Sequence, residues 1–529
     1  MFTIRLMHTL VTIGGLTLIS RLIGFVRDIL TAIFLGAGPI SDAFFVALRF
    51  PNFFRRLFAE GAFHGAFIPL FTAEYHDHGK RAALSFASDV LSVMLMILVP
   101  FSLFVIILMP YLLMVVAPGF EARPAQFALA VDLTRITFCY LICISLVALL
   151  GGMLNSMNHF APFAAIPIVF NVGLIVALGI SSWFGVLPSY ALAYGISIAG
   201  VVQLVMMWYV AQRNGITLHV TYPRITPQIR KLLRLIGPGA FGALVMQITS
   251  FIDIFLGSLV GAGAISYLYY AERLYQLPLA VIGIALGTSL LPMLSRSIAS
   301  GNDVQAHFTL NRGLEIGFLF GLPAAIGLGI AAELIMSVLF ERGAFDSSAT
   351  QAAAYALRAY ALGIPAYVAI KILNADYFAH QDTLSPVKAA IITLIVNVLL
   401  AYSLIDILGH VGIALATGLT TWLNVVLLMV GLRPRGYLRI DYPFVRRILY
   451  MSICAVMMGV VVYGIISVSD RWVTVGSSID RVLVLICVLI GGGVSYGSLA
   501  VMFGVISMEE LRDLFRLRDI KTTKRHKIK

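Results

Sequence analysis

Four arginines in otherwise apolar stretches have chemistry that needs an explanation. Arg21, Arg27 and Arg55 lie in the first part of the chain, and Arg273 lies in the segment YLYYAERLYQLP. A guanidinium stays protonated, and its planar fork makes paired, charge-assisted hydrogen bonds to phosphate. An arginine at a bilayer centre costs about 2.5–3.5 kcal/mol on insertion scales, so it needs a hydrated cavity or buried partners. The four arginines are therefore predicted ligands of an anionic group.

Other charged and polar residues in the same segments could support or gate such a site. We predict this role for Asp42, Arg49, Arg56, Glu60, Glu272 and Ser266. Two structural alternatives stay open. Arg27 and Asp28 could lie near a helix end and extend to lipid headgroups. Arg273 could pair with Glu272 or cap a helix.

A helix over residues 10–34 would position the first two arginines. At about 100° per residue, its polar and small residues fall within an arc of roughly 140°. These residues are Gly14, Thr17, Ser20, Arg21, Gly24, Arg27, Asp28 and Thr31. Leucine, isoleucine and valine fill most of the remainder. The pattern predicts one side that faces lipid and one side that faces water or protein.

The composition of the chain places these helices in a membrane. Of 529 residues, 60% are hydrophobic and only 12% are charged, whereas soluble domains carry about 25% charged residues. We therefore predict an all-α integral membrane protein. The net charge of +12 fits basic loops that face anionic lipid and the cytoplasm, and no nucleic-acid-binding motif is visible.

Apolar stretches long enough to cross a bilayer predict about fourteen transmembrane helices. The second is expected to break at Pro51. Lysine and arginine collect in alternate loops and in the C-terminal tail, which predicts that both termini are cytoplasmic. The predicted spans are 9–35, 40–75, 84–117, 125–157, 160–182, 187–212, 232–260, 264–298, 305–339, 348–380, 384–405, 409–432, 444–468 and 480–506.

An internal repeat divides the chain into two halves. GAGPIS at 36–41 recurs as GAGAIS at 261–266, and Leu154-Asn155 with Asn171 recurs as Leu373-Asn374 with Asn397. Six spans per half predict two parallel halves related by a pseudo-two-fold axis along the membrane normal, with two further C-terminal helices. The predicted parts are 1–215 for the first half, 216–236 for a basic linker, 237–434 for the second half, 435–510 for the extra helices and 511–529 for a basic tail.

Two parts of this division allow a second interpretation. The linker TYPRITPQIRKLLRLIG is basic and amphipathic, as expected of a segment that lies on the membrane surface, but it could equally be a solvated connection. The Gly-Pro-Gly sequence at 237–239 is a plausible hinge. Prolines within the spans could also be tolerated kinks without motion.

The segments that carry the arginines resemble the MurJ (MviN) family of lipid II flippases, within the MOP exporter superfamily. The resemblance rests on SRLIGFVRD, GAGPISDAFFVALRFPNFFRRLFAEGAF, FIPLFTAEY, GAGAISYLYYAERLYQLPLAVIGIALGTSLLP and FERGAF. It implies a transporter of the bacterial cytoplasmic membrane that moves lipid II, a polyprenyl-diphosphate-linked sugar-peptide, to the outer leaflet by alternating access for peptidoglycan synthesis. It also implies a cavity lined by Arg21, Arg27, Arg55 and Arg273, and a groove for the polyprenyl chain beside the last two helices. Those two helices could instead serve only in packing.

Other functions are weaker interpretations of the same residues. A different MOP transporter, such as an oligosaccharide-lipid flippase or a drug or cation antiporter, is the alternative, but a cationic substrate would need acidic residues. A membrane enzyme or scaffold is a third possibility. No P-loop or other catalytic motif is present, and no metal site is predicted. We expect no cofactor, with coupling to the membrane potential or an ion left open; contacts with other cell-wall synthesis proteins are also left open.

Overall fold

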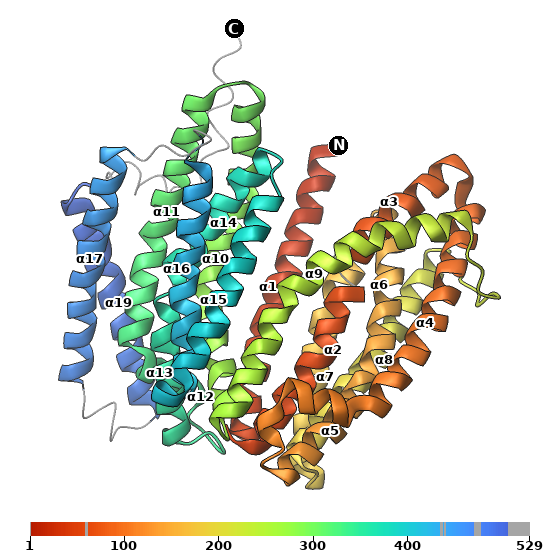
Figure 1. Ribbon diagram of the computed structural model, residues 1–529, viewed down its shortest axis with the longest axis horizontal. Helices are drawn as coiled ribbons and strands as arrows, with labels where there is room; N and C mark the ends of the chain where they lie inside the picture. The colour runs from red at the N-terminus through yellow and green to blue at the C-terminus, as the bar shows by residue number, and fades with distance from the viewer. Residues whose placement is uncertain (1, 59–61, 434–436, 438–440, 470–477, 506–529) are drawn as a thin grey trace. The chain divides into compact units, whose positions relative to one another are not determined.

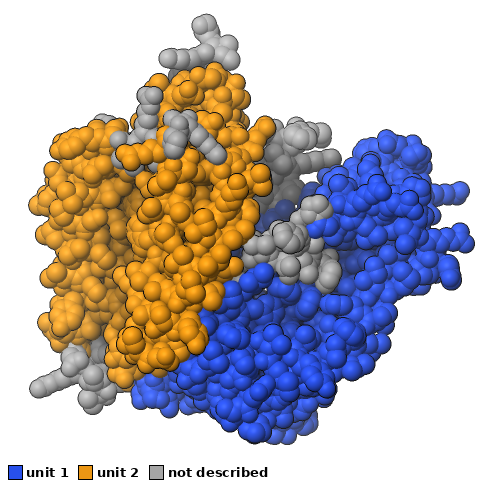
Figure 2. All heavy atoms as spheres, in the orientation of Figure 1, with its two compact units in different colours: residues 1–267, 340–349 blue, residues 268–339, 350–529 orange. Residues whose placement is uncertain are grey.

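The computed structural model is helical and divides into two compact units (Figures 1 and 2). It describes residues 2–58, 62–433, 437, 441–469 and 478–505, and no strand occurs among them. The description of side chains further excludes residues 2–11, 56–58, 62, 238–246, 249–250, 284–288 and 478.

Unit 1 comprises residues 1–267 together with 340–349. Neighbouring helices of this unit pack in pairs, such as α1 with α7, α2 with α5, and α3 with α9. Its helices are α1 (Phe2–Leu35), α2 (Pro39–Phe58), α3 (Ala62–Asp77), α4 (Gly79–Val116), the short η1 (Pro118–Phe120), α5 (Pro124–Phe138), α6 (Tyr140–Ser156), α7 (Ala161–Phe184), α8 (Pro188–Arg213) and α9 (Pro227–Val260).

Unit 2 comprises residues 268–339 and 350–529. It contains most of α10, whose first turn belongs to unit 1, and most of α13. Its helices are α10 (Ala264–Ala299), α11 (Asp303–Ile330), α12 (Ala332–Phe340), α13 (Ser347–Ala361), α14 (Ile364–Ala379), α15 (Leu384–Leu408), α16 (His410–Leu432), α17 (Tyr442–Val468) and α19 (Ser478–Met502). The unit boundaries follow packing, so the predicted division into repeats, linker and tail stays a prediction.

Length and composition support membrane crossing by many of these helices. Among the described residues, nine helices are long and apolar enough to span a bilayer, or ten if the bent pair α13 and α14 forms one span. The two members of that pair meet at 41°. The count of about fourteen spans in the whole chain remains a prediction, because the nine or ten helices are counted among the described residues only.

The expected break at Pro51 is wrong. Helix α2 continues through Pro51 to Phe58, and α3 begins at Ala62. A proline leaves the carbonyl four residues earlier without its helical hydrogen bond. Here Thr137 Oγ1 on α5 donates to that carbonyl, Ala47 O, at 2.9 Å. The neighbouring helix thus satisfies the freed acceptor, and α2 stays helical.

The two C-terminal helices pack on unit 2 through α11. The Tyr496 hydroxyl on α19 donates to Leu319 O at 2.9 Å, the carbonyl that Pro323 leaves free. Glu315 on α11 is buried and accepts hydrogen bonds at 2.8 Å from both Arg312 and Arg447, the latter on α17. These contacts attach the extra helices to the body of unit 2.

The linker after α8 lies along α4. The backbone N–H of Thr221 donates to Ser92 Oγ at 2.8 Å, and that of His219 donates to Ser88 Oγ at 3.3 Å. Thr226 then caps α9 by accepting from the Ile229 N–H. Helix α9 runs on through residues 237–239, the predicted hinge. Whether this segment lies on a membrane surface stays a prediction.

The loop at 340–349 belongs to unit 1, although the chain on either side of it belongs to unit 2. The Ala344 N–H donates to Ile33 O at 2.8 Å, near the end of α1. Gly36 and Gly343 both have positive φ, and a Cβ at either position would collide with the opposite backbone. Two glycines therefore allow this close contact.

Candidate functional site

Arg27 is buried in unit 1 with two partners. Its residue exposure is 7% and that of Asp28 is 4%. Arg27 Nε and Nη2 donate to Asp28 Oδ1 at 3.2 and 2.6 Å, and Nη1 donates to Asn171 Oδ1 on α7 at 2.9 Å. A buried charge is tolerated when it is paired and hydrogen-bonded in this way. The alternative in which this pair extends to lipid headgroups does not fit its burial.

Small and polar residues of α1 let α7 reach this pair. A Cβ at Gly24 would come within 3.2 Å of Asn171 Nδ2. The same amide nitrogen donates to Ser20 O at 3.3 Å. The Asn171 side chain therefore binds two turns of α1: it donates to the backbone carbonyl of Ser20 and accepts from the Arg27 side chain.

Arg21 lies on the same helix in a different environment. Its side chain is exposed, and no described residue forms a hydrogen bond or an ion pair with it. Leu18 and Leu22, its neighbours in the helix, are 63% and 62% exposed. Arg21 thus has guanidinium donors available for a ligand.

Helix α2 carries the other predicted arginines of unit 1. Arg49 and Arg55 are half-buried. Arg55 Nε donates to Asn52 Oδ1 at 3.3 Å, one turn earlier on the same helix. The side chain of Arg56 and the whole of Glu60 lie outside the described residues.

Asp42 joins the first turns of α2 and α10 within unit 1. It is fully buried, as are Ser41 and Ser266. The N–H groups of Gly263 and Ser266 donate to its two carboxylate oxygens at 2.6 and 2.8 Å, and Ser266 Oγ donates at 2.6 Å. A carboxylate at a helix N-terminus satisfies free N–H groups and interacts favourably with the helix dipole. Asp42 therefore caps α10 from a different helix.

The two copies of the glycine-rich repeat meet at this junction. Ser41 Oγ and Ser266 Oγ, which occupy the same place in GAGPIS and GAGAIS, lie 2.9 Å apart. Ser41 Oγ also accepts from the Gly38 N–H at 2.7 Å, which caps its own helix. The junction thus consists of equivalent residues from both repeats.

In unit 2, Arg273 lies against a tyrosine of its own helix. Arg273 Nη2 donates to the Tyr269 hydroxyl at 2.8 Å, and its guanidinium carbon lies 4.9 Å from the centre of that ring. Glu272 accepts from Gln276 Nε2 at 2.8 Å, one turn away. Tyrosine stacking orients the guanidinium without neutralising its charge.

The structure brings some predicted residues together and separates others. Asp42 contacts Ser266, while Arg27 contacts Asp28. Arg273 belongs to unit 2, whereas the other three arginines belong to unit 1. A shared cavity of the four arginines stays a prediction.

The sequence prediction missed two contributors. The repeat pattern includes Asn171 without indicating its contact with Arg27, although an asparagine within an apolar helix is itself a signal of a buried polar partner. The FERGAF motif does not by itself indicate a packing role, yet this loop places Phe340 and Phe345 in unit 1, where both are buried. Its contact with the end of α1 joins residues far apart in the sequence, so no local pattern indicates it.

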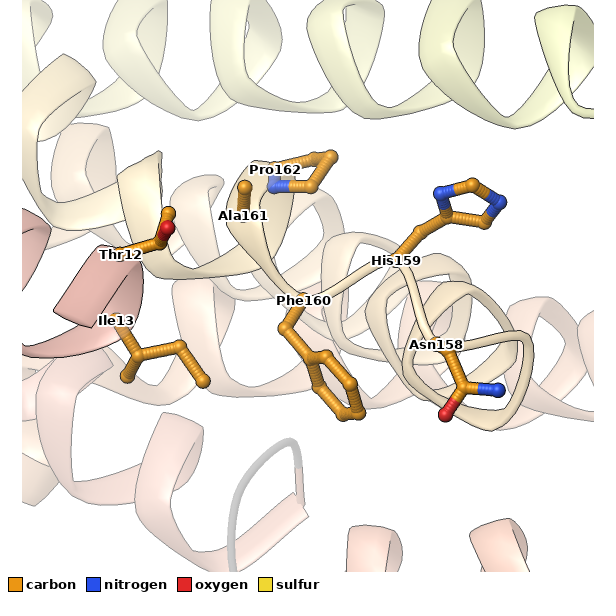
Figure 3. A pocket seen from close by; sticks show the side chains of 7 residues that line it. All are labelled: Thr12, Ile13, Asn158, His159, Phe160, Ala161 and Pro162. Atoms are coloured by element: carbon orange, nitrogen blue, oxygen red, sulfur yellow. The ribbon is translucent and has the colours of Figure 1, made fainter. Parts of the chain in front are cut away.

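Unit 1 also contains a cavity. It has a volume of about 230 Å³ and lies between α1 and the connection from α6 to α7 (Figure 3). None of the predicted site residues lines it. Its lining residues are Thr12, Ile13, Asn158, His159, Phe160, Ala161 and Pro162.

Comparison with known sequences gives consistent matches along most of the chain. Residues 31–483 match the family model described as lipid II flippase MurJ. A probable lipid II flippase MurJ of Rhizobium tropici is 40% identical over 475 residues, covering 88% of each chain. The lipid II flippase MurJ of Burkholderia cenocepacia is 35% identical over 441 residues, covering 82% of this chain and 84% of its own length.

Comparison with solved structures agrees. A lipid II flippase MurJ in an inward closed conformation matches with a TM-score of 0.78 and 25% identity, covering 95% of this chain and 99% of its own. An inward-facing multidrug resistance MATE transporter of the MOP superfamily matches with a TM-score of 0.63 at 14% identity, over 78% of this chain and 94% of its own, which shows likeness of fold alone. The predicted all-α membrane transporter fold is confirmed.

Proposed function

This chain belongs to the MurJ family of lipid II flippases, and from that premise we propose how its own residues move the substrate. The proposal depends on one observation. Arg27 is buried and donates three hydrogen bonds to protein groups, whereas Arg21, on the same helix, is exposed with no described partner. The two arginines therefore have different roles in handling a diphosphate.

Arg21, Arg55 and Arg273 bind the diphosphate of lipid II in this proposal. Each guanidinium can offer a planar fork to phosphate oxygens. Arg27 contributes positive charge and holds α1 against α7, and it reaches the substrate only if its contact with Asn171 opens. Arg49, Arg56, Glu60 and Glu272 adjust the charge of the segments that carry the arginines.

The junction at Asp42 serves as a gate. Alternating access requires contacts that form in one state and break in another. Asp42, Ser41 and Ser266 fit this role, because a few hydrogen bonds between the first turns of two helices can separate without disrupting either helix. Opening this junction would accompany release of the headgroup.

The protein works in the bacterial inner membrane, with both termini in the cytoplasm. The excess of Lys and Arg, 37 against 25 Asp and Glu, lies in the loops assigned to that side. The polyprenyl chain stays in lipid beside α17 and α19.

No bond of the substrate is broken, so the protein is a transporter and not an enzyme. It uses no cofactor, and the membrane potential or an ion supplies the energy.

The test measures lipid II translocation in cells depleted of their own flippase. We expect Arg21→Ala, Arg55→Ala and Arg273→Ala to lower translocation at least about tenfold, since each removes a phosphate contact that is charge-assisted. Arg21→Lys should retain part of the activity, because the charge remains but the fork is lost.

Arg213→Ala is the matched control. Arg213 is an exposed arginine at the end of α8, stacked on Tyr209, and its loss should leave translocation unchanged. All variants are compared at equal membrane levels. Full translocation by Arg21→Ala, Arg55→Ala and Arg273→Ala would overturn the proposed phosphate contacts.

A further inference from the structure

Lys371 is a charged residue within an apolar helix, and it has no part in the function proposed so far. It lies at the middle of α14, in the bent span that α13 and α14 form. Most of α14 is buried in unit 2, including Val368, Ile372 and Ala375. Lys371 is exposed, and no described residue forms a hydrogen bond or an ion pair with its ammonium.

The exposed side of α14 is partly polar. Tyr367, Lys371, Asn374 and Phe378 follow one another at intervals of three or four residues, and all four escape full burial. Such spacing places them on one helix face. Asn374 Oδ1 has no hydrogen-bond partner among the described residues. This face therefore offers a cation and an amide group next to each other.

Glycine on α10 makes room for the lysine. A Cβ at Gly283 would collide with Lys371 Nζ, so the ammonium lies against the backbone of α10 there. Gly283 is on the same helix as Arg273. At a rise of 1.5 Å per residue it lies about 15 Å further along. Arg273 and Lys371 thus both belong to unit 2. Arg273 is on α10, and Lys371 of α14 contacts α10 at a different point along its axis.

An ammonium in this place needs a functional reason. At the centre of a span a lysine costs about 2.5–3.5 kcal/mol on insertion scales, and Lys371 lies two turns inside the end of the bent span. The end of α14 that leads out of the bent span, at Ala379, is about 12 Å away along the axis, which is longer than the stem of a lysine can extend to reach headgroups. An anionic ligand that passes this face would compensate the cost.

We propose that Lys371 binds an anionic oxygen group of the lipid II headgroup during translocation. The inference rests on the proposed function. Lysine acts as a point charge with three donors, which suits either a phosphate or a carboxylate. Two groups of the substrate have this chemistry: the diphosphate and the carboxylates of the peptide. The separation from Arg273 along α10 allows one substrate to contact both cations through different groups.

The experiment measures the affinity of purified full-length protein for two lipids. One is lipid II, and the other is the polyprenyl-diphosphate disaccharide without peptide. We expect Lys371→Met to weaken lipid II binding about tenfold, and Lys371→Arg to stay near the unmodified protein because it keeps the charge. Lys388→Met removes an exposed lysine near the start of α15 and should change nothing.

The two lipids identify the group that is bound. Loss of affinity for lipid II alone assigns Lys371 to a peptide carboxylate, and equal loss for both lipids assigns it to the diphosphate. Unchanged affinity of Lys371→Met for both lipids, while Arg273→Ala weakens binding, would overturn this inference and leave the proposed function intact. If Arg273→Ala also binds normally, the proposed arginine contacts fail as well.

A second set of variants tests the geometry without removing the charge. Gly283→Ala should displace the Lys371 ammonium and weaken lipid II binding severalfold. In a Lys371→Ala background the same substitution should have no further effect, since no long side chain remains to be displaced. Thermal unfolding of each variant checks that the fold is kept. Additive losses in the double variant would contradict the proposed contact.

Discussion

Arg27 and Asn171 form a buried contact between two helices of unit 1. The guanidinium of Arg27 has lost most of its access to water, so every N–H group that lacks a partner carries a desolvation cost. Asn171 removes part of that cost and also binds the backbone of α1. This one amide therefore contributes twice to the stability of the helix pair, through Arg27 and through the backbone of α1.

Replacing this amide should destabilise the protein measurably. We expect Asn171→Ala to lower the free energy of unfolding by about 1–3 kcal/mol, since it leaves a buried charged donor without its partner. Thermal unfolding in detergent is the measurement. The control is Asn397→Ala, because Asn397 is the repeat counterpart and donates only to the neutral hydroxyls of Thr417 and Thr420. An equal or larger loss in Asn397→Ala would contradict the charged-donor argument.

Asp346 makes the start of α13 sensitive to acid. The Ala349 N–H and the Ser348 hydroxyl donate to its carboxylate and hold the pKa below the ordinary value of 3.8. A depressed pKa means that the stabilisation is present above 3.8 and is lost as the pH falls through the lower, folded-state value. We expect amide hydrogen exchange at residues 347–350 to quicken in that acid range. Asp346→Asn should abolish this pH step, and its persistence would point to another titrating group.

At the scale of elements, prolines in the helices are matched by donors from neighbours. Pro51, Pro110 and Pro323 each leave a carbonyl free one turn earlier. Thr137, Arg135 and Tyr496 donate to Ala47 O, Ile106 O and Leu319 O respectively. These three prolines therefore fit the interpretation of tolerated kinks, since each freed acceptor is satisfied within its own unit.

The pair of Pro51 and Thr137 allows a direct test. Thr137→Val keeps the shape and removes the hydroxyl, so we expect a loss of about 1 kcal/mol in the free energy of unfolding. In a Pro51→Ala background, residue 51 regains its N–H and can satisfy Ala47 O, and Thr137→Val should then cost much less. Thr134→Val is the control, because that hydroxyl bonds only within its own helix. Equal losses in both backgrounds would refute the role assigned to Thr137.

Sequence patterns predicted the helices, but not which of their residues meet. The apolar runs indicated the spans, and the repeat indicated that residues 36–41 and 261–266 are equivalent. That these copies touch through Ser41 and Ser266 depends on packing between distant segments, which no local period encodes. Likewise, Pro51 predicts a break only when no neighbour supplies a donor, and Thr137 lies far along the chain.

At the scale of the whole molecule, the gate proposed at Asp42 predicts that fixing this junction arrests the transport cycle. The serine oxygens lie 2.9 Å apart, so cysteines at both positions should form a disulfide on oxidation. We expect Ser41→Cys with Ser266→Cys to stop translocation under oxidising conditions and to recover with reductant. The variant is made after replacing the four native cysteines, two of which are exposed. Each single cysteine serves as a control, and undiminished transport in the oxidised pair would exclude the gate.

The loop at 340–349 also bears on how the protein is made. Unit 1 includes these residues, so a ribosome that has completed the first 267 residues has not yet synthesised all of it. Until Ala344 emerges, the carbonyl of Ile33 lacks its hydrogen-bond donor, and Gly36 lacks its close contact with the backbone of Ala344. The nascent N-terminal part must therefore wait in the membrane in an unfinished state. Maturation of the first unit is thus tied to synthesis of the second, and truncated chains that end before this loop should be preferred substrates for membrane proteases.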